Sequence, residues 1–224
     1  MKPGVVCWQS PSNIALIKYW GKYGNQLPQN PSLSLTLKNA LTKMKVSYSF
    51  SGSGKLQTEL LFEGKESPLF HKKVNSFLTS IFTYFPFLNQ LKIRIETENT
   101  FPHSAGIASS ASSMSALALC LCSIENDLFE SLKIKEDFYK KASFIARLGS
   151  GSASRSVYGG MVLWGRHEGF SASSNEFAIP FREKIHPNFE FLNDAILIVN
   201  ESVKKVSSSQ GHALMQDHPY AKSR

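Results

Sequence analysis

The stretch 101–121, FPHSAGIASSASSMSALALCL, combines a loop of small residues with the start of an apolar helix. The first N–H groups of a helix have no partner within the helix, and the helix dipole adds partial positive charge there. Small residues such as Gly106 and Ala108 let a phosphate group approach this backbone. The hydroxyls of Ser109 and Ser110 can bind phosphate oxygens or a metal ion. The composition of the stretch therefore indicates a phosphate cradle.

A simpler interpretation is that Ser109, Ser110 and Ser112 only cap the helix. The stretch lacks the Gly-Lys-Ser/Thr ending of a Walker loop and the Gly-x-Gly-x-x-Gly spacing of a dinucleotide fingerprint. The segment before it, Leu91–Glu98, alternates strictly between apolar and polar residues, which predicts a strand. Because strand, loop and helix follow one another here, we favour the phosphate cradle over simple capping.

A second stretch, 13–30, mixes polar and aromatic side chains with apolar ones without a regular period, which is typical of functional loops. These side chains are Asn13, Lys18, Tyr19, Trp20, Lys22, Tyr23 and Asn30. If Ile14–Lys22 is helical, Lys18 and Lys22 share one face, where two ammonium groups repel each other unless an anion lies between them. The stretch thus indicates either an anion site or a solvated basic face.

A third stretch, GSGSASRSVYGGMVLW at Gly149–Trp164, brings Ser150, Ser152 and Ser154 close to Arg155. The guanidinium group is planar and donates two parallel hydrogen bonds, which suits a carboxylate or a phosphate. A flexible Gly/Ser linker with a surface arginine is the alternative. Because apolar segments flank this short, cationic stretch, we interpret it as a second anion-binding turn.

Hydrophobic periodicity predicts the elements that position these three stretches. Strands are predicted at 5–10, 32–38, 43–50 and 91–98, and the SGSG turn at 51–54 predicts that 55–63 returns as a hairpin partner. Helices are predicted at 69–84, after Ser67 and Pro68, and at 135–148. A loop-rich segment at 166–188 precedes a predicted buried strand at 194–200 and a final helix that 204–211 would cap.

The 224 residues are 42% apolar, which is ordinary for a globular protein, and the net charge of +8 favours an anionic partner. The basic residues are scattered, which argues against nucleic-acid binding, and no apolar run is long enough to span a membrane. The N-terminus lacks the apolar segment of a signal peptide. Cys7, Cys120 and Cys122 lack metal-ligand spacing, and the last two are expected to be buried free thiols. We therefore expect a cytoplasmic enzyme without nucleic-acid or membrane partners.

Three segments resemble the diphosphomevalonate decarboxylases of the GHMP kinase superfamily: NIALIKYWGK at 13–22, PHSAGIASSAS at 102–112 and GSGSASRSVYGG at 149–160. The first and third are specific to the decarboxylases, and the second is shared across the superfamily. The resemblance implies a GHMP kinase-like α+β fold. Its N-terminal domain at 1–188 would resemble the second domain of ribosomal protein S5, and 189–224 would begin a ferredoxin-like C-terminal domain.

The resemblance also implies the reaction. ATP phosphorylates the 3-hydroxyl of (R)-5-diphosphomevalonate, and the loss of phosphate and CO2 then gives isopentenyl diphosphate and ADP, in the mevalonate pathway of isoprenoid biosynthesis. The implied ligands of ATP and Mg2+ lie in the loop, with Ser110 at the metal: Gly106, Ala108, Ser109, Ser110 and Ser112.

The same resemblance assigns the substrate contacts. Tyr19, Lys18 and Lys22 would bind the diphosphate, and Arg155, helped by Asn13, would hold the carboxylate. Ser150 and Ser152 would lie beside the carboxylate, and Ser208, in VSSSQG at 206–211, would line the same cleft. The implied catalytic residues are Arg155, Lys22 and Asn13.

One departure from the family pattern concerns an acidic residue. The family carries an Asp-Ala-Gly-like stretch in a later C-terminal segment, and neither Asp194 nor Asp217 matches its aspartate. Family chains are also longer, so we expect an incomplete second lobe and little turnover by this chain alone. Family members are often homodimers, and the sequence leaves the oligomeric state of this chain open.

Two other functions stay open on the sequence. A related GHMP enzyme would act on mevalonate or its monophosphate, and the contact between Lys22 and a diphosphate would distinguish it. A catalytically incomplete binding module would be consistent with the missing aspartate. A nucleic-acid binder is the least favoured, because aromatic and basic residues do not alternate on a recognisable platform.

Overall fold

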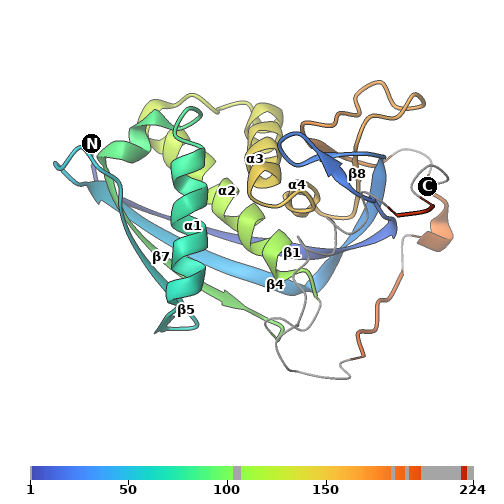
Figure 1. Ribbon diagram of the computed structural model, residues 1–224, viewed down its shortest axis with the longest axis horizontal. Helices are drawn as coiled ribbons and strands as arrows, with labels where there is room; N and C mark the ends of the chain where they lie inside the picture. The colour runs from blue at the N-terminus through green and yellow to red at the C-terminus, as the bar shows by residue number, and fades with distance from the viewer. Residues whose placement is uncertain (1, 103–106, 183–184, 190–191, 198–217, 221–224) are drawn as a thin grey trace.

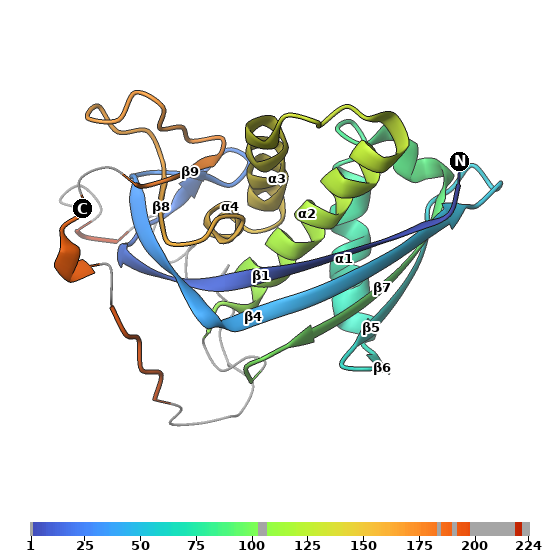
Figure 2. The same cartoon turned by 180° about the vertical axis from the view of Figure 1, so that it is seen from behind.

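The computed structural model describes residues 2–102, 107–182, 185–189, 192–197 and 218–220. Within these ranges, seven strands form one sheet, and four α-helices lie over it (Figure 1). In the view from behind, the strands of the sheet lie in front of the helices, so the helices share one face (Figure 2). The protein therefore has an α+β fold of two layers.

The sheet runs in the order β6 (Lys65–Glu66), β5 (Gln57–Phe62), β7 (Leu91–Asn99), β4 (Ser32–Phe50), β8 (Met161–Trp164) and β9 (Ala178–Pro180), and β1 (Gly4–Ile17) pairs with β4. The long strand β4 organises the sheet because it has three antiparallel partners. It pairs with β1 along most of its length, with β7 at 42–50 and with β8 at 32–35.

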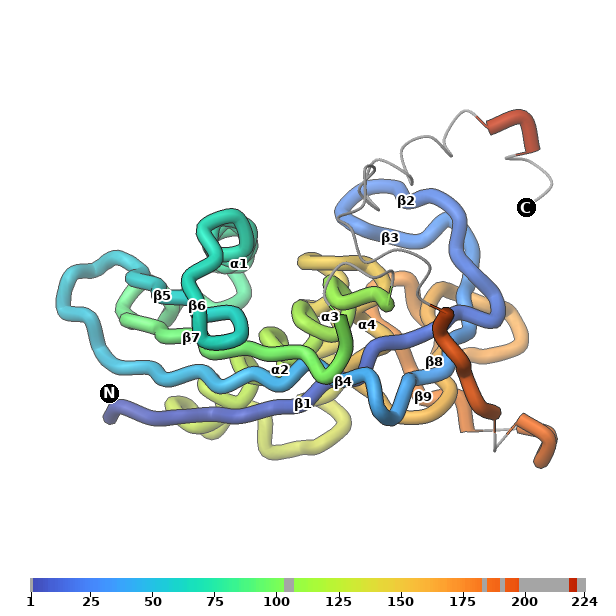
Figure 3. The backbone as a smooth tube through the Cα atoms, turned by 90° about the horizontal axis from the view of Figure 1, so that it is seen from below, coloured from blue at the N-terminus to red at the C-terminus, as the bar shows by residue number. Residues whose placement is uncertain are grey.

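A separate hairpin is formed by β2 (Lys22–Tyr23) and β3 (Leu27–Pro28). In the view from below, this hairpin lies apart from α1, at the end of the sheet that carries β8 and β9 (Figure 3). Lys22, the first residue of β2, lies close to the turn after α3, because a Cβ atom built at Gly151 would lie 3.4 Å from Lys22 Cε.

The helices are α1 (Pro68–Ser80), α2 (Ser109–Phe129), α3 (Lys135–Gly149) and the short α4 (Ala153–Ser156), with 3₁₀ turns at Pro86–Gln90 and Pro187–Phe189. Side chains that alternate along β4 and β7 face these helices and form the core, Val46 and Ile95 among them. Helix α2 is buried along 111–122, where it packs against β1, β4 and α3. The core therefore anchors the N-terminus of α2 above β1 and β4.

Most predicted elements are confirmed. The strands predicted at 5–10, 43–50 and 91–98 lie within β1, β4 and β7, and the helix predicted at 135–148 lies within α3. The predictions at 32–38 and 43–50 form one strand, β4, and the helix predicted at 69–84 begins at Pro68 and ends at Ser80. Cys120 and Cys122 are buried free thiols, as expected, and burial raises the pKa of both.

Three predicted features are wrong. The segment 55–63 is not the hairpin partner of 43–50, because β7 lies between them and β5 pairs with β7 in parallel. The stretch 14–22 is not helical, because β1 continues to Ile17 in pairing with β4. The described part of the strand predicted at 194–200, residues 194–197, is exposed and has no strand partner.

Some predictions lie outside the described residues. They are Gly106, the end of the strand predicted at 194–200, the capping segment 204–211, and Ser208 with its motif. Of the final helix predicted after this segment, only residues 218–220 are described, and they are not helical. The division at 188 and the ferredoxin-like start of a second domain stay predictions. Among the described residues, we find no helix with both the length and the apolar character needed to cross a membrane.

Candidate active site

Arg155 lies at the centre of the candidate site, and only 2% of its surface is exposed. Its Nη1 donates to Ser32 Oγ at 2.7 Å, and its Nη2 donates to Asn13 Oδ1 at 3.1 Å. The guanidinium carbon lies 5.5 Å from the ring centroid of Tyr19 and 5.7 Å from that of Trp164. Three strands (β1, β4 and β8) and the loop after β1 therefore hold this one cation of α4 by hydrogen bonds and cation–π contacts.

The buried charge of Arg155 has no carboxylate partner among the described residues, and its Nε has no hydrogen-bond acceptor there. Burial lowers the pKa of Arg155 to about 10, so the side chain is still protonated at neutral pH. A buried cation is costly unless an anion pairs with it. The free Nε–H therefore indicates a place for an anionic group of a ligand.

Asn13 fixes one side of the guanidinium group. Its Nδ2 donates to Ser156 Oγ at 2.7 Å and to Ser152 O at 3.2 Å, which directs Oδ1 toward Arg155. Asn13 follows an irregularity in β1, where pairing with β4 shifts from Pro11–Leu41 to Asn13–Thr36. Successive side chains of a regular strand point to opposite faces, but such an irregularity changes their direction. Ser12 and Asn13 are consecutive, and both are buried.

Tyr19 and Lys22 lie against the same serine turn. Tyr19 is buried, which raises its pKa, and its hydroxyl forms a hydrogen bond with Ser152. Lys22 Nζ lies 5.9 Å from the ring centroid of Tyr19 and donates to Gln26 Oε1 at 2.5 Å, and burial lowers the pKa of Lys22. A Cβ atom added at Gly151 would lie 3.4 Å from Lys22 Cε, so the turn and the hairpin are in contact.

Lys18 occupies a different position from Lys22. It is exposed just after β1 ends, and its Nζ lies 5.7 Å from the ring centroid of Trp20. The expectation that the two lysines share a helical face is therefore wrong, because the chain between them is not helical. Lys22 is the lysine that the structure places beside Tyr19 and Gly151.

The N-terminus of α2 begins with an unusual backbone conformation. Ala108 has a φ of 51°, in the left-handed region that residues other than glycine seldom adopt. Such strain often accompanies functional sites. Ser109 is half-buried and Ser110 is exposed, so both hydroxyl-bearing residues lie at the open end of the helix.

The side chain of Ser112 contacts the sheet, and its predicted contact with the nucleotide stays a prediction. The residue is fully buried, and its Oγ lies 2.6 Å from Thr42 Oγ1. The same Oγ donates to Ser109 O at 3.2 Å. Ser112 therefore holds the first turn of α2 against β4.

Two adjacent residues of β1 connect the loop before α2 to the arginine site. Ser12 Oγ donates to Ile107 O, and the next residue, Asn13, accepts from Arg155. Ser150 and Ser152 are half-buried in the turn that precedes α4, next to these groups. Adjacent residues of one strand thus fix both of the predicted anion-binding elements.

Sequence reasoning missed Ser12, Ser32 and Trp164 as residues of the site. Ser12 and Ser32 are fully buried, and each binds a group that belongs to one of the two elements. The alternation in 32–37 gave no signal for Ser32, because Ser32 and Ser34 are fully buried while Leu33 and Leu35 are only half-buried. The aromatic contact of Trp164 depends on tertiary packing and has no local signal.

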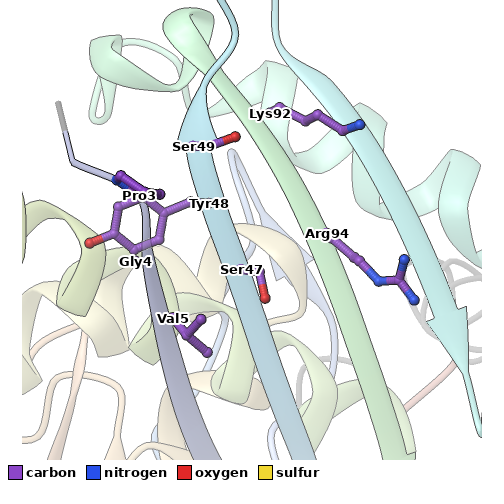
Figure 4. Close-up of a pocket in the computed structure, with 8 residues that line it drawn as sticks. All are labelled: Pro3, Gly4, Val5, Ser47, Tyr48, Ser49, Lys92 and Arg94. Carbon is purple, nitrogen blue, oxygen red and sulfur yellow. The ribbon is translucent and has the colours of Figure 1, made fainter.

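Two surface cavities lie away from this site. One, of about 380 Å³, is lined by β1, β4 and β7, and Figure 4 shows Lys92 and Arg94 extending from β7 at its rim. The other, of about 570 Å³, includes Cys7 and Lys43. Within the described residues, no group of three or more histidine, cysteine, aspartate or glutamate side chains could hold a metal ion.

The fold defines an α+β protein of the GHMP kinase type. The chain belongs to the family of diphosphomevalonate decarboxylase-like N-terminal domains, whose model matches residues 10–176. The diphosphomevalonate decarboxylase of Aspergillus fumigatus is 34% identical over 217 residues, which cover 90% of this chain and 50% of that protein. The chain therefore spans about half the length of the curated relatives it matches.

Solved structures agree with this family. The mevalonate diphosphate decarboxylase of Legionella pneumophila superposes with a TM-score of 0.72 at 29% identity, over 98% of this chain and 66% of that chain. A structure of MDDEF in complex with MVAPP, AMPPCP and magnesium superposes with a TM-score of 0.63 at 32% identity, over 81% of this chain and 51% of that chain. That relative is thus seen with MVAPP, AMPPCP and magnesium bound.

Proposed function

We propose that this chain provides the substrate- and nucleotide-binding part of an ATP-dependent diphosphomevalonate decarboxylase. ATP would phosphorylate the 3-hydroxyl of (R)-5-diphosphomevalonate, and loss of phosphate with CO2 would give isopentenyl diphosphate and ADP. The observation that carries the proposal is the buried guanidinium group of Arg155, whose Nε–H has no acceptor among the described residues. A substrate carboxylate would supply that acceptor and neutralise the charge.

The remaining roles follow from position. Arg155 would hold the carboxylate, with Asn13 and Ser32 fixing the guanidinium plane, and Lys22 beside Tyr19 would bind the diphosphate. Lys18, being exposed, would contribute charge from further out. Ser150, Ser152 and Ser208 stay predicted neighbours of the substrate.

The N-terminus of α2 fits a nucleotide phosphate with its metal ion. Ala108, Ser109 and Ser110 combine free helix N–H groups with hydroxyls at an open end, and Gly106 precedes them in the chain. Ser110 and the phosphate oxygens would be ligands of Mg2+, as the family resemblance implies. Mg2+ would supply charge neutralisation at the phosphates, while this helix would orient the transferred group toward the substrate.

Loss of CO2 breaks the bond between carbons 1 and 2, and it requires that the carboxylate is held firmly while positive character develops at carbon 3, from which the phosphate departs. The aromatic rings of Tyr19 and Trp164 flank Arg155 and keep water away from it. A low-polarity environment strengthens the ion pair in the resting complex, so its geometry is fixed before phosphoryl transfer. The cytoplasmic location and a homodimeric state stay predictions of the family resemblance.

Calorimetric titration of the full chain tests this function. We expect (R)-5-diphosphomevalonate to bind at least about tenfold more tightly than 5-phosphomevalonate, with mevalonate weaker still, because each phosphate adds charge-assisted hydrogen bonds. Equal affinity for the diphosphate and the monophosphate would favour the related GHMP enzyme. The absence of binding to all three ligands, with ATP and Mg2+ present, would contradict the proposal.

A further inference from the structure

A second buried arginine, Arg147 of α3, lies outside the site described above. Only 2% of its surface is exposed, and its ring contact is with Phe144, at 5.0 Å from the guanidinium carbon to the ring centroid. Its Nη1 donates to the backbone carbonyl of Asn25. Its Nε and Nη2 donate to Glu176 O at 2.7 Å and Glu176 Oε2 at 2.6 Å. All the polar partners of Arg147 therefore lie in loops outside α3.

The contact with Asn25 falls at the tip of the β2–β3 hairpin. Asn25 lies in the turn between Tyr23 and Leu27, and the next residue, Gln26, accepts a hydrogen bond from Lys22 Nζ. Figures 1 and 2 both show this hairpin beside α3. Arg147 thus binds the chain one residue away from the group that orients the lysine.

The base of the same hairpin is held separately. Asn30 Oδ1 accepts from Trp20 N at 2.8 Å, and Asn30 Nδ2 donates to Lys18 O at 3.2 Å. Asn175 Nδ2 donates to Tyr23 OH at 2.9 Å on one side of the hairpin. A two-residue pairing between β2 and β3 is too short to be stable alone, so these outer contacts fix its position.

We propose that Arg147 is a positioning residue that fixes the β2–β3 hairpin so that Lys22 is preorganised for the phosphorylated end of the substrate. The proposal rests on the proposed function for its ligand and on the contacts above for its mechanism. A guanidinium group can reach a carbonyl, a carboxylate and a second carbonyl at once, whereas a lysine offers one donor centre. Arg147→Lys should therefore keep the charge but hold the hairpin less firmly.

Hydrogen–deuterium exchange of the full chain tests the positioning directly. In Arg147→Gln, the peptides that cover 19–30 should exchange about tenfold faster than in the unmodified protein, and those of β4 and α2 should not change. In Arg147→Lys, the increase should be smaller. Lys141→Gln is the matched control, because Lys141 also makes a partly buried ion pair from α3, at 2.6 Å to Glu125, but does not contact the hairpin.

Ligand binding distinguishes positioning from a purely structural anchor. We expect the Kd for inorganic diphosphate to rise about tenfold in Arg147→Gln and less than twofold in Lys141→Gln, while the Kd for ATP with Mg2+ changes less than twofold in either. Unchanged exchange at 19–30, or an equal loss of diphosphate and ATP binding, would overturn the proposal. If the unmodified protein binds no diphosphate, the proposed function fails, and the exchange result still decides whether Arg147 positions the hairpin.

Discussion

Ser12 and Asn13 are neighbours in β1, yet Ser12 binds the carbonyl of Ile107 before α2 and Asn13 binds the guanidinium group of Arg155. Both side chains are buried because the pairing of β1 with β4 is irregular at this point. One bulge therefore brings the predicted nucleotide loop and the predicted carboxylate site to the same place. Neither element could move without disturbing the strand that holds the other.

Replacing Ser12 with alanine tests this connection. Ser12→Ala leaves the buried carbonyl of Ile107 without its donor, which should lower the free energy of unfolding by about 1–3 kcal/mol. We also expect weaker binding of ATP with Mg2+, because the loop before α2 loses its anchor. Urea denaturation and calorimetry measure the two effects, and a stable protein with unchanged nucleotide affinity would show that the contact does not position the loop.

Replacing Lys22 with alanine tests which end of the substrate the hairpin binds. Lys22→Ala should raise the Kd for (R)-5-diphosphomevalonate about tenfold or more, and the Kd for 5-phosphomevalonate much less. Exposed Lys18 provides the comparison, since Lys18→Ala should have the smaller effect. Equal changes for both ligands in Lys22→Ala would place the diphosphate elsewhere.

Gly151 tests the contact between the serine turn and the hairpin. A Cβ atom there would lie 2.8 Å from Trp164 Cη2 and 3.4 Å from Lys22 Cε. Gly151→Ala should therefore destabilise the protein by about 1–3 kcal/mol through overpacking, and should displace Lys22. Gly159→Ala is the matched control, because a Cβ atom at Gly159 would meet nothing within 4 Å. Similar urea midpoints for the two variants would contradict the packing described here.

The pKa of Arg155 predicts the pH dependence of carboxylate binding. Because burial lowers this pKa from 12.5 to about 10, the cation persists through neutral pH and is lost in the folded protein above about pH 10. Between about pH 10 and pH 12.5, Arg155 is deprotonated in the folded protein but still protonated in the unfolded chain. The free energy of unfolding therefore rises with pH in this range, because the folded protein no longer buries a charge. Substrate affinity should stay level at neutral pH and fall near pH 10. The Lys22→Ala protein is the suitable background, since burial also lowers the pKa of Lys22.

Local pattern predicted much of the fold but not its pairing. The alternation in Leu91–Glu98 and the apolar run after Ser113 were sufficient for β7 and α2. The parallel pairing of β5 with β7 was not predictable, because a hairpin and a parallel neighbour require the same alternation. The strand at 14–17 was mistaken for a possible helix, because its partner in β4 lies far along the chain.

The same division holds for the candidate site. The sequence predicted that Asn13, Tyr19, Lys22 and Arg155 serve one ligand, and the structure places these side chains together, although their roles stay predictions. The direction of Ser112 could not be predicted, because a serine in the first turn of a helix can face either solvent or the sheet. Arg147 was missed because its partners, Asn25 and Glu176, come from distant loops.

The most direct test of the account compares two ligands that differ in the carboxylate, with Arg155 present or replaced. The ligands are (R)-5-diphosphomevalonate and isopentenyl diphosphate, which lacks the carboxylate, and the variants are Arg155→Gln and Arg155→Lys. Calorimetry should show that Arg155→Gln raises the Kd for (R)-5-diphosphomevalonate about 100-fold and the Kd for isopentenyl diphosphate less than about threefold. Arg155→Lys should raise the Kd for (R)-5-diphosphomevalonate by an intermediate factor. An equal loss for both ligands, or no loss for either, would contradict the assignment of Arg155 to the substrate carboxylate.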